Sequence, residues 1–413
     1  MVRSIVRPGS VEQGMGSPNG ARSILLTGGT GYLGGLIAAT LLVNEDVHLL
    51  VPVRSKTFED FIRPIQAEIE IDGLQFKPSY ESRIHLVELP EFDSLNELDQ
   101  AVREFHVDEI IHCAGCLDYF DRQTLEAVNV GFTRKLLAQA KSWNIRRFTY
   151  ISTAFSSGYI DDVVPERLHS EPSKDPTYYT QSKREAERFV AESGLPFLII
   201  RPSIVIGSSR DGHYSGKQYG LYQLWAGMER LLCRTWHRDL HAFAPRQAVS
   251  LLHQDAFQNG FLAAYRFLPN DSIMNLVPEH DSLPELRTLW QLWVTECLRP
   301  QFVYYYRNMA DIPVRSINTL QRALLGLASV NLEIASHPWQ FDMTNLKWLR
   351  GRGLELPRTT EESVAVCQRR FIAESETIRK FMIENAESRA DQIEFIERPA
   401  EEIALTAAVT MAE

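Results

Sequence analysis

The sequence predicts an α/β fold, with a doubly wound parallel sheet followed by a mainly helical C-terminal part. From Ser23 to about Val205, strand patterns alternate with helix patterns, which is typical of parallel strands joined by crossover helices. After Gly207 the alternation ends, and from Ser282 the pattern is mostly helical. The strands are expected at 23–27, 47–53, 84–88, 109–113, 147–152 and 197–201, and the helices between them include 31–43, 94–105, 122–142 and 177–193.

The composition is that of an ordinary globular chain, since 44% of its 413 residues are apolar and 23% are charged. The formal net charge of -10 argues against nucleic acid as a partner. Five scattered cysteines suit a reducing compartment, so we expect a cytoplasmic location. Residues 1–20 are polar and lack the apolar core of a signal peptide, so they are interpreted as a flexible tail. No run approaches the ~20 apolar residues of a membrane span.

The first predicted strand enters a glycine-rich turn, and a helical pattern leaves it. The turn carries Gly28, Gly31 and Gly34, and the mostly apolar residues 36–42 follow. Glycines let the backbone approach a pyrophosphate closely, and the charge of that group then lies at the helix N-terminus. This order of strand, turn and helix predicts a dinucleotide site.

The second predicted strand ends at Arg54, with Ser55 and Lys56 behind it. Sites that prefer NAD usually place Asp or Glu at this point, on the ribose 2′-hydroxyl. An arginine pairs a 2′-phosphate instead, so NADP is the favoured cofactor. NAD stays open, because an arginine also stacks on adenine without contacting the phosphate. Pro52 inside this strand predicts a strand end or a bulge.

Two cysteines, Cys113 and Cys116, follow the fourth predicted strand with the spacing of a redox or zinc motif. A structural zinc site of this kind needs a second pair of ligands. No second pair accompanies these two cysteines in the sequence, so we expect no metal.

The fifth predicted strand ends in two hydroxyl residues, Ser152 and Thr153, and the helical pattern after it carries Tyr179 and Lys183. Residues four apart on a helix project from one face, so the lysine lies near the phenol. A phenol with a pKa of about 10 needs such a charge to exchange its proton near neutral pH. Of the 14 tyrosines, Tyr179 alone has a lysine at the fourth position after it. A hydroxyl residue upstream is suited to donate a second hydrogen bond to a substrate oxygen.

In this order, these elements resemble those of the extended short-chain dehydrogenase/reductase superfamily, over roughly residues 23–280. Segments 111–115 and 201–207, and the pair Asn129–Val130, match it as well. The resemblance implies a Rossmann fold in which Tyr179 is the acid or base. It also implies that Lys183 lowers the pKa of Tyr179 and holds the nicotinamide ribose. The carbonyl would be oriented by Thr153, in preference to Ser152.

The resemblance further implies which residues bind the cofactor. They follow the predicted strands or lie on the helices after them, and Glu88 stands where the superfamily has Asp. The residues are Thr27, Gly28, Thr30, Gly31, Tyr32, Leu33, Gly34, Arg54, Glu88, Leu89, Ala114, Gly115, Asn129, Tyr179, Lys183, Pro202, Ser203 and Val205.

Within the superfamily, segments 151–155 and 201–212 are similar to those of the thioester reductase and fatty acyl reductase branch. The resemblance implies a dinucleotide-binding domain of residues 21–205 and 245–268, and a substrate-side cap of residues 206–244 and 269–413. The implied function is an NAD(P)H-dependent reductase that transfers hydride to a carbonyl carbon of a large apolar substrate. An acyl thioester, carried by CoA or by an acyl carrier protein, is the favoured substrate, and an aldehyde or alcohol is the product.

Two alternatives stay open. One is a reductase or epimerase of the same superfamily that acts on a ketone of a secondary metabolite, a sterol or a nucleotide-sugar. The other is a cofactor-binding regulatory protein without catalysis, which the presence of Thr153, Tyr179 and Lys183 argues against. Aromatic residues after Gly207, including the run 302–306, suit an apolar substrate, although such clusters more often form core. The sequence leaves the acyl chain length and the oligomeric state open.

Overall fold

The structure is a computed structural model that describes residues 22–71, 73–89 and 95–398. The flexible tail expected at 1–20 lies outside the described residues. The chain forms two compact units, which are described separately. The first unit contains the described residues up to Ser203 together with Asp255–Val277 and Phe341–Leu356. The second unit contains Ile204–Gln254, Pro278–Gln340 and the described residues from Pro357 on.

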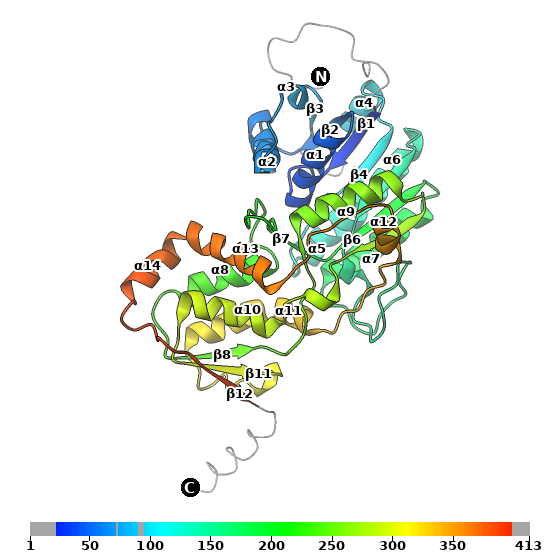
Figure 1. Ribbon diagram of the computed structural model, residues 1–413. Coiled ribbons are helices and arrows are strands. Elements are labelled where there is room, and N and C mark those ends of the chain that lie inside the picture. The colour runs from blue at the N-terminus through cyan, green and yellow to red at the C-terminus, as the bar shows by residue number, and fades with distance from the viewer. Residues whose placement is uncertain (1–21, 72, 90–94, 399–413) are drawn as a thin grey trace. The chain divides into compact units, whose positions relative to one another are not determined.

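The first unit is built on a seven-stranded parallel sheet (Figure 1), which confirms the predicted fold class. The strand order is β10-β6-β5-β4-β1-β2-β3. Six of the strands lie where the alternating pattern predicts them, and β10 was not predicted. The strands are Arg22–Thr27 (β1), Val47–Val53 (β2), Ile84–Glu88 (β3), Glu109–His112 (β4), Arg147–Ile151 (β5), Phe197–Pro202 (β6) and Ser272–Leu276 (β10).

Helices cover both faces of this sheet, which explains why its strands are apolar almost without interruption. On one face, side chains of α4, α6 and α7 pack with those of the strands in a single buried cluster that includes Leu98, Leu136 and Val190. Helices α1 and α9 lie on the other face (Figure 1). The longer helices are Tyr32–Asn44 (α1), Phe58–Ile71 (α2), Asn96–Glu104 (α4), Thr133–Ser142 (α6), Tyr178–Glu192 (α7) and Gln254–Phe267 (α9). Short helices are Pro78–Glu81 (α3), Arg122–Leu125 (α5) and Thr344–Arg350 (α12).

Pro52 lies inside β2 without ending it, contrary to the prediction of a strand end or a bulge. The odd-numbered residues of β2 bond to β3, since the Leu49 amide donates to the Arg83 carbonyl and the Val53 carbonyl accepts from Leu89. The backbone nitrogen of Pro52 therefore faces the β1 side, where pairing stops at Leu50. The missing N–H costs no ladder hydrogen bond, and this is why a proline is tolerated here.

The second unit has more strand than the sequence predicts. A three-stranded parallel sheet has the order β12-β11-β8, and β7 pairs with β9. The aromatic run 302–306 forms the central strand, with Tyr305 and Tyr306 buried, so it contributes to the core of this unit. The strands are Ile204–Ile206 (β7), Asp239–Phe243 (β8), Leu251–His253 (β9), Phe302–Tyr306 (β11) and Glu394–Arg398 (β12). The helices are Leu221–Leu232 (α8), Leu286–Trp293 (α10), Thr319–Ser336 (α11), Glu361–Glu374 (α13) and Glu376–Glu384 (α14).

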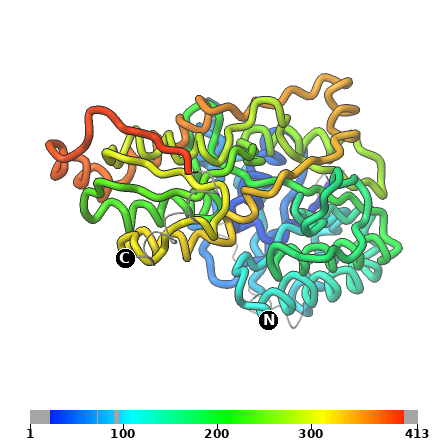
Figure 2. Tube along the Cα trace, turned by 90° about the horizontal axis from the view of Figure 1, so that it is seen from below, coloured from blue at the N-terminus to red at the C-terminus, as the bar shows by residue number. Residues whose placement is uncertain are grey.

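The division into units differs from the expected domain boundaries at four segments. Residues 204–205 and 245–254, which were expected in the dinucleotide-binding domain, belong to the second unit. Residues 269–277 and 341–356, both assigned to the cap by the sequence analysis, belong to the first unit. The first of these contains β10, and the second returns from far along the chain to the first unit, as the orange part of the tube shows (Figure 2). In the described part of the chain, no helix has the length and apolar character that crossing a membrane requires.

Candidate active site

Because all seven strands run parallel, their C-terminal ends share one edge of the sheet, and the loops that leave them lie together there. Thr27 pairs with His112, and His112 in turn with Tyr150, so the ends of β1, β4 and β5 are adjacent. Doubly wound sheets bind ligands at this edge. Val205 belongs to β7 of the second unit. The other residues predicted from the sequence end a strand of the sheet, follow one, or lie on the helices after them.

The glycine-rich turn has a geometry that only glycine satisfies at two positions. Gly28 has a φ of 73°, and a Cβ there would lie 2.5 Å from the backbone nitrogen of Ala114. A Cβ on Gly34 would lie 2.1 Å from the Gly28 carbonyl oxygen. The turn is thus packed tightly against both the loop after β4 and the first turn of α1. The N-terminus of α1 has no side-chain cap, so its amides are suited to receive an anionic group.

Arg54 directly follows β2, and Glu88 ends the neighbouring strand β3. Both side chains are exposed, whereas Leu89 behind them is buried and bonded through its amide to the Val53 carbonyl. An exposed arginine therefore follows the end of β2, and the neighbouring strand β3 ends in an exposed carboxylate.

Asn129 is buried in the helical segment that comes after β4, and it holds the loop that carries Ala114 and Gly115. Its Oδ1 accepts a hydrogen bond from the Cys116 amide at 2.7 Å, and its Nδ2 donates to the Ser182 hydroxyl at 2.9 Å. A Cβ on Gly115 would lie 3.3 Å from the Asn129 amide oxygen. Asn129 sits in a π-helical segment, Glu126–Phe132, and such segments occur frequently at functional sites.

Lys183 projects from α7 onto the end of β5, and its side chain is buried. Its Nζ donates to the Ile151 carbonyl at 2.7 Å and lies 4.3 Å from the centroid of the Tyr150 ring. Burial lowers the pKa of the Lys183 ammonium from 10.5 to about 8, although nearby Cys113 and Glu187 oppose this shift. The lysine is thus held next to the strand end that leads into Ser152 and Thr153.

Tyr179 stands one turn before Lys183 on the same helix, with its ring 5.9 Å from that of Tyr119. Burial raises the pKa of the Tyr179 phenol above its ordinary value, and Tyr119, Cys113 and Cys116 add to the effect. The family resemblance implies that Lys183 lowers the pKa of Tyr179, whereas in the structure desolvation is the largest influence and raises it. The phenol therefore carries its proton at neutral pH, which suits a proton donor.

The two hydroxyl residues after β5 have different partners. Ser152 donates its hydroxyl hydrogen to the buried carboxylate of Glu187. Thr153 has an extended backbone, and its side-chain oxygen accepts a long bond of 3.4 Å from the Phe155 amide. Because that bond uses only an acceptor position, the hydroxyl hydrogen of Thr153 is available to a substrate oxygen. This supports Thr153 over Ser152 as the second donor.

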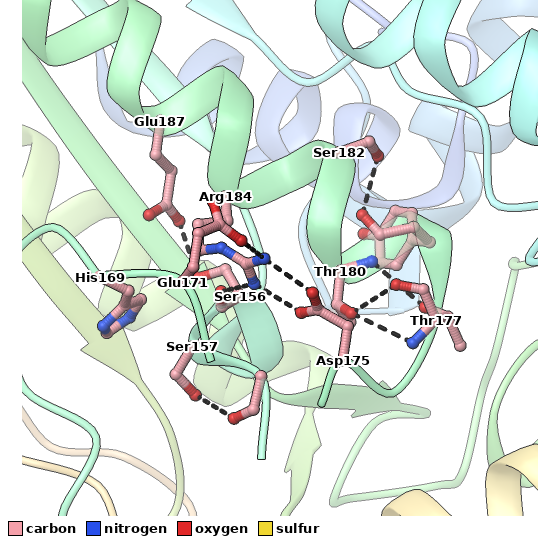
Figure 3. A network of polar contacts seen from close by, with 12 residues as sticks. Ser156, Ser157, His169, Glu171, Asp175, Thr177, Thr180, Ser182, Arg184 and Glu187 are labelled. Carbon is pink, nitrogen blue, oxygen red and sulfur yellow. Dashed lines mark hydrogen bonds and ion pairs between the residues drawn. The ribbon is translucent and has the colours of Figure 1, made fainter. Parts of the chain in front are cut away.

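A network of ion pairs and hydrogen bonds around the buried Arg184 holds α7 against the segment that follows β5 (Figure 3). Glu187 forms an ion pair with Arg201 of β6 at 2.6 Å, and both side chains are inaccessible to solvent. Arg184 forms ion pairs with Asp175 and Glu171 and donates to the Ser156 carbonyl. These contacts hold the helix of Tyr179 and Lys183 in place relative to the end of β5.

The end of β6 carries the last predicted site residues of the first unit. Pro202 is buried, and Ser203 follows it with its amide bonded to Leu276 of β10. The Ser203 hydroxyl is buried and has no hydrogen-bond partner among the described residues. Such a group is costly without a partner, and a bound ligand would supply one. Together with the close approach at Gly28 and the uncapped α1, it fits a dinucleotide cofactor.

Sequence reasoning did not identify Tyr119 and Tyr150 as parts of the site. Tyr150 lies in the middle of an apolar strand, where an aromatic residue is read as core, and its contact with Lys183 follows from tertiary structure. Tyr119 lies shortly after Gly115 in the loop that follows β4, and this position is the one feature of the sequence that could have identified it as a site residue. A redox role for Cys113 is not supported, because burial raises the pKa of its thiol to about 11 and the reactive species is the thiolate.

Residues 26–258 of the chain match the family described as male sterility protein, NAD_binding_4. The match covers more than half of the chain. The chain belongs to this family. Its membership of the male sterility protein family confirms the resemblance to reductases of the short-chain dehydrogenase type and supports an oxidoreductase that uses a nicotinamide cofactor.

Among curated proteins, the chain is similar to fatty acyl-CoA reductase wat of Drosophila melanogaster, with 25% identity over 365 residues, which are 78% of this chain and 65% of that protein. It is also similar to glycine betaine reductase ATRR of Emericella nidulans, with 28% identity over 216 residues, which are 46% of this chain and 16% of that protein. The chain therefore spans less than two thirds of the length of either relative.

Among solved structures, the fold is shared with the terminal R domain from the myxalamid PKS-NRPS biosynthetic pathway. The TM-score is 0.68 at 22% identity, and the match covers 87% of this chain and 93% of that domain. UDP-glucuronic acid 4-epimerase from Bacillus cereus, in complex with UDP-glucuronic acid and NAD, gives a TM-score of 0.55 at 15% identity, covering 88% and 99%. At these identities the likeness shows the fold alone.

Proposed function

We propose that the protein is an NADPH-dependent reductase of acyl thioesters, with an aldehyde as the first product and an alcohol as a further one. The observation that carries the proposal is the buried Lys183 bonded to the Ile151 carbonyl, at the strand end that leads into Thr153 and one turn from Tyr179. Membership of the male sterility protein family and the similarity to a fatty acyl-CoA reductase support the thioester as substrate.

NADP is the cofactor that the exposed Arg54 favours. A guanidinium at the end of β2 pairs a 2′-phosphate through two hydrogen bonds, and Ser55 and Lys56 stand next to it in the chain. The glycine-rich turn and the amides at the start of α1 would hold the pyrophosphate, and Asn129 keeps the loop of Ala114 and Gly115 in place beside it.

The bound nicotinamide supplies the hydride. Thr153 and Tyr179 donate hydrogen bonds to the carbonyl oxygen and stabilise the negative charge that develops there. With a thioester, the adduct expels thiolate and gives an aldehyde, a step that needs no proton from Tyr179. With an aldehyde, the phenol of Tyr179 delivers its proton to the oxygen and gives an alcohol. The second reduction should therefore depend on Tyr179 more strongly than the first.

An apolar substrate is supported by the loop after β4, which carries large apolar side chains and contacts Tyr179 through Tyr119. Leu117 and Phe120 are 38% and 81% exposed, and Tyr119 between them contacts the Tyr179 ring. Asp118 orders this loop by accepting a hydrogen bond from the Phe120 amide at 3.0 Å. Exposed apolar side chains on an ordered loop suit contact with an acyl chain. Similarity to a terminal R domain of a synthetase pathway supports a carrier-protein thioester beside the CoA ester.

The runner-up is a reductase or epimerase that acts on a ketone, which the shared fold with a nucleotide-sugar epimerase accommodates. The two functions are separated by substrate. We expect oxidation of NADPH with long-chain acyl-CoA and with aldehydes. If the protein reduces ketones but no thioester, the alternative function is the correct one. The roles of Thr153, Tyr179 and Lys183 would be unaffected by that result.

The roles of the residues are tested by three variants. Tyr179→Phe should slow aldehyde reduction by roughly 10²–10⁴-fold while NADPH still binds. Tyr178→Phe is the matched control, because this neighbouring tyrosine on the same helix is 47% exposed, and its rates should equal those of the wild type. Arg54→Ala should weaken NADPH binding roughly 10- to 150-fold and leave NADH binding nearly unchanged. Equal affinity of the wild type for NADH and NADPH would contradict the cofactor assignment.

A further inference from the structure

The ammonium of Lys183 is held by two consecutive residues of β5. One contact is polar, since the Nζ donates to the Ile151 carbonyl at 2.7 Å. The other is to an aromatic ring, with the Nζ 4.3 Å from the centroid of Tyr150. A cation over a ring is attracted by its electron-rich face, and the attraction is strongest where water is excluded. Here the ring is completely buried and the lysine nearly so.

The Tyr150 ring is itself fixed in place. His112 of β4 stacks on it with ring centroids 5.6 Å apart. The two imidazole nitrogens of His112 contact the hydroxyls of Thr27, at 2.6 Å, and Thr133, at 2.8 Å. Thr27 ends the strand that enters the glycine-rich turn. A continuous row of contacts thus links this turn to the head group of Lys183 through His112 and Tyr150.

We propose that Tyr150 is a positioning residue for Lys183, and that its ring, not its hydroxyl, holds the ammonium at the end of β5 and keeps it charged. The proposal rests on the proposed function, and on the role that the family resemblance implies for Lys183, which is to hold the nicotinamide ribose. The hydroxyl contributes no bond, because it has no hydrogen-bond partner among the described residues. Burial raises the pKa of the Tyr150 phenol, so the ring stays neutral.

The groups around Lys183 keep their charge between pH 6 and 9. Burial lowers the pKa of His112 to about 3 and raises that of the Cys113 thiol to about 11. Tyr179 stays protonated, since its pKa is raised, and Glu187 stays ionised, since its pKa is lowered. Lys183, with a pKa of about 8, is therefore the group of this set that titrates in the range.

The test is the pH dependence of NADPH binding, measured by fluorescence from pH 6 to 9.5. In the wild type, the NADPH affinity should change with a midpoint near pH 8, because Lys183 titrates there. In Lys183→Met this transition should be absent. Tyr150→Leu removes the ring, and the ionisation constant of Lys183 should change about tenfold, which moves the midpoint down by about one pH unit. Tyr150→Met serves the same purpose should the leucine variant fail to fold, as judged by thermal unfolding. Tyr150→Phe keeps the ring and should keep the midpoint.

Phe148→Leu is the matched control. Phe148 lies two residues earlier on the same face of β5, is equally buried, and also contacts His112, with ring centroids 5.8 Å apart. Its loss creates a similar cavity and should leave the midpoint unchanged. A folded Tyr150→Leu or Tyr150→Met variant with a wild-type midpoint would overturn the proposal, as would an equal shift in Phe148→Leu. A lower midpoint in Tyr150→Leu or Tyr150→Met supports the positioning role of Tyr150 even if the protein reduces no thioester. A midpoint that survives in Lys183→Met would contradict both the proposal and the role of Lys183 in the proposed function.

Discussion

Glu187 should be the most stability-critical carboxylate near the active site. Its buried carboxylate accepts two hydrogen bonds from Arg201, at 2.6 and 2.9 Å, and two more from the hydroxyls of Ser152 and Ser156. Glu187→Gln keeps the shape but removes the charge, which leaves the buried guanidinium of Arg201 without a counter-ion. Breaking a buried pair in this way costs about 3–5 kcal/mol.

In a domain of about 150–250 residues, such as the first unit, a loss of about 3–5 kcal/mol lowers Tm by roughly 6–20 °C. The assay is thermal unfolding at pH 7, followed by circular dichroism. Arg103→Ala is the control, because this arginine forms an exposed ion pair with Asp99, and its removal should change Tm little. Replacing both partners, in Glu187→Leu combined with Arg201→Leu, should recover much of the loss.

The effect should also depend on pH. Burial by itself raises the pKa of Glu187, but the charge of Arg201 and the hydrogen bonds from Arg201 and Ser152 outweigh it and hold the pKa below 4.5. A depressed pKa stabilises the fold above the ordinary pKa, and the contribution is lost as the pH falls through the folded value. The difference between wild type and Glu187→Gln should therefore shrink in acid. A Glu187→Gln variant that unfolds within about 2 °C of the wild type at pH 7 would refute this account of the pair.

Two other predictions follow from particular contacts. Gly34→Ala places a methyl group 2.1 Å from the Gly28 carbonyl oxygen, so it should cost at least about 1–3 kcal/mol and weaken NADPH binding at least tenfold. Gly35→Ala, one position on, meets its nearest atom at 4.0 Å and should stabilise α1 by about 0.5–1 kcal/mol, so equal effects of the two would contradict the steric argument. For Glu166, burial raises the pKa to about 7 although the amides of Asn275 and Asn345 donate to its carboxylate. The Glu166 carboxylate thus binds its proton more tightly in the folded protein than in the unfolded chain. The free energy of unfolding should therefore fall as the pH rises from about 4.5 to 7. Denaturant titrations give the free energy of unfolding at pH 5 and at pH 8. In Glu166→Gln the difference between these two free energies should be smaller than in the wild type by about 1–2 kcal/mol, and an unchanged difference would count against the burial effect.

The sequence by itself determined the order of the elements in the first unit, and it supplied most of the residues of the candidate site. Six strands and the helices at Tyr32–Asn44 and Tyr178–Glu192 lie where the pattern placed them, because parallel strands buried on both faces are apolar throughout and end at glycine or polar residues. Spacing was enough to place Tyr179 and Lys183 one turn apart on the same helix, since a four-residue separation is a local property.

Tertiary structure decided what local patterns do not encode. The strand Ser272–Leu276 joins the sheet from a distant part of the chain, and the run 302–306 became a strand through partners that lie far from it in sequence. Burial reversed the expected direction of the Tyr179 pKa, because desolvation depends on everything packed around the phenol. The contact between Tyr150 and Lys183 likewise exists only because α7 crosses the end of β5, which no spacing along the chain reveals.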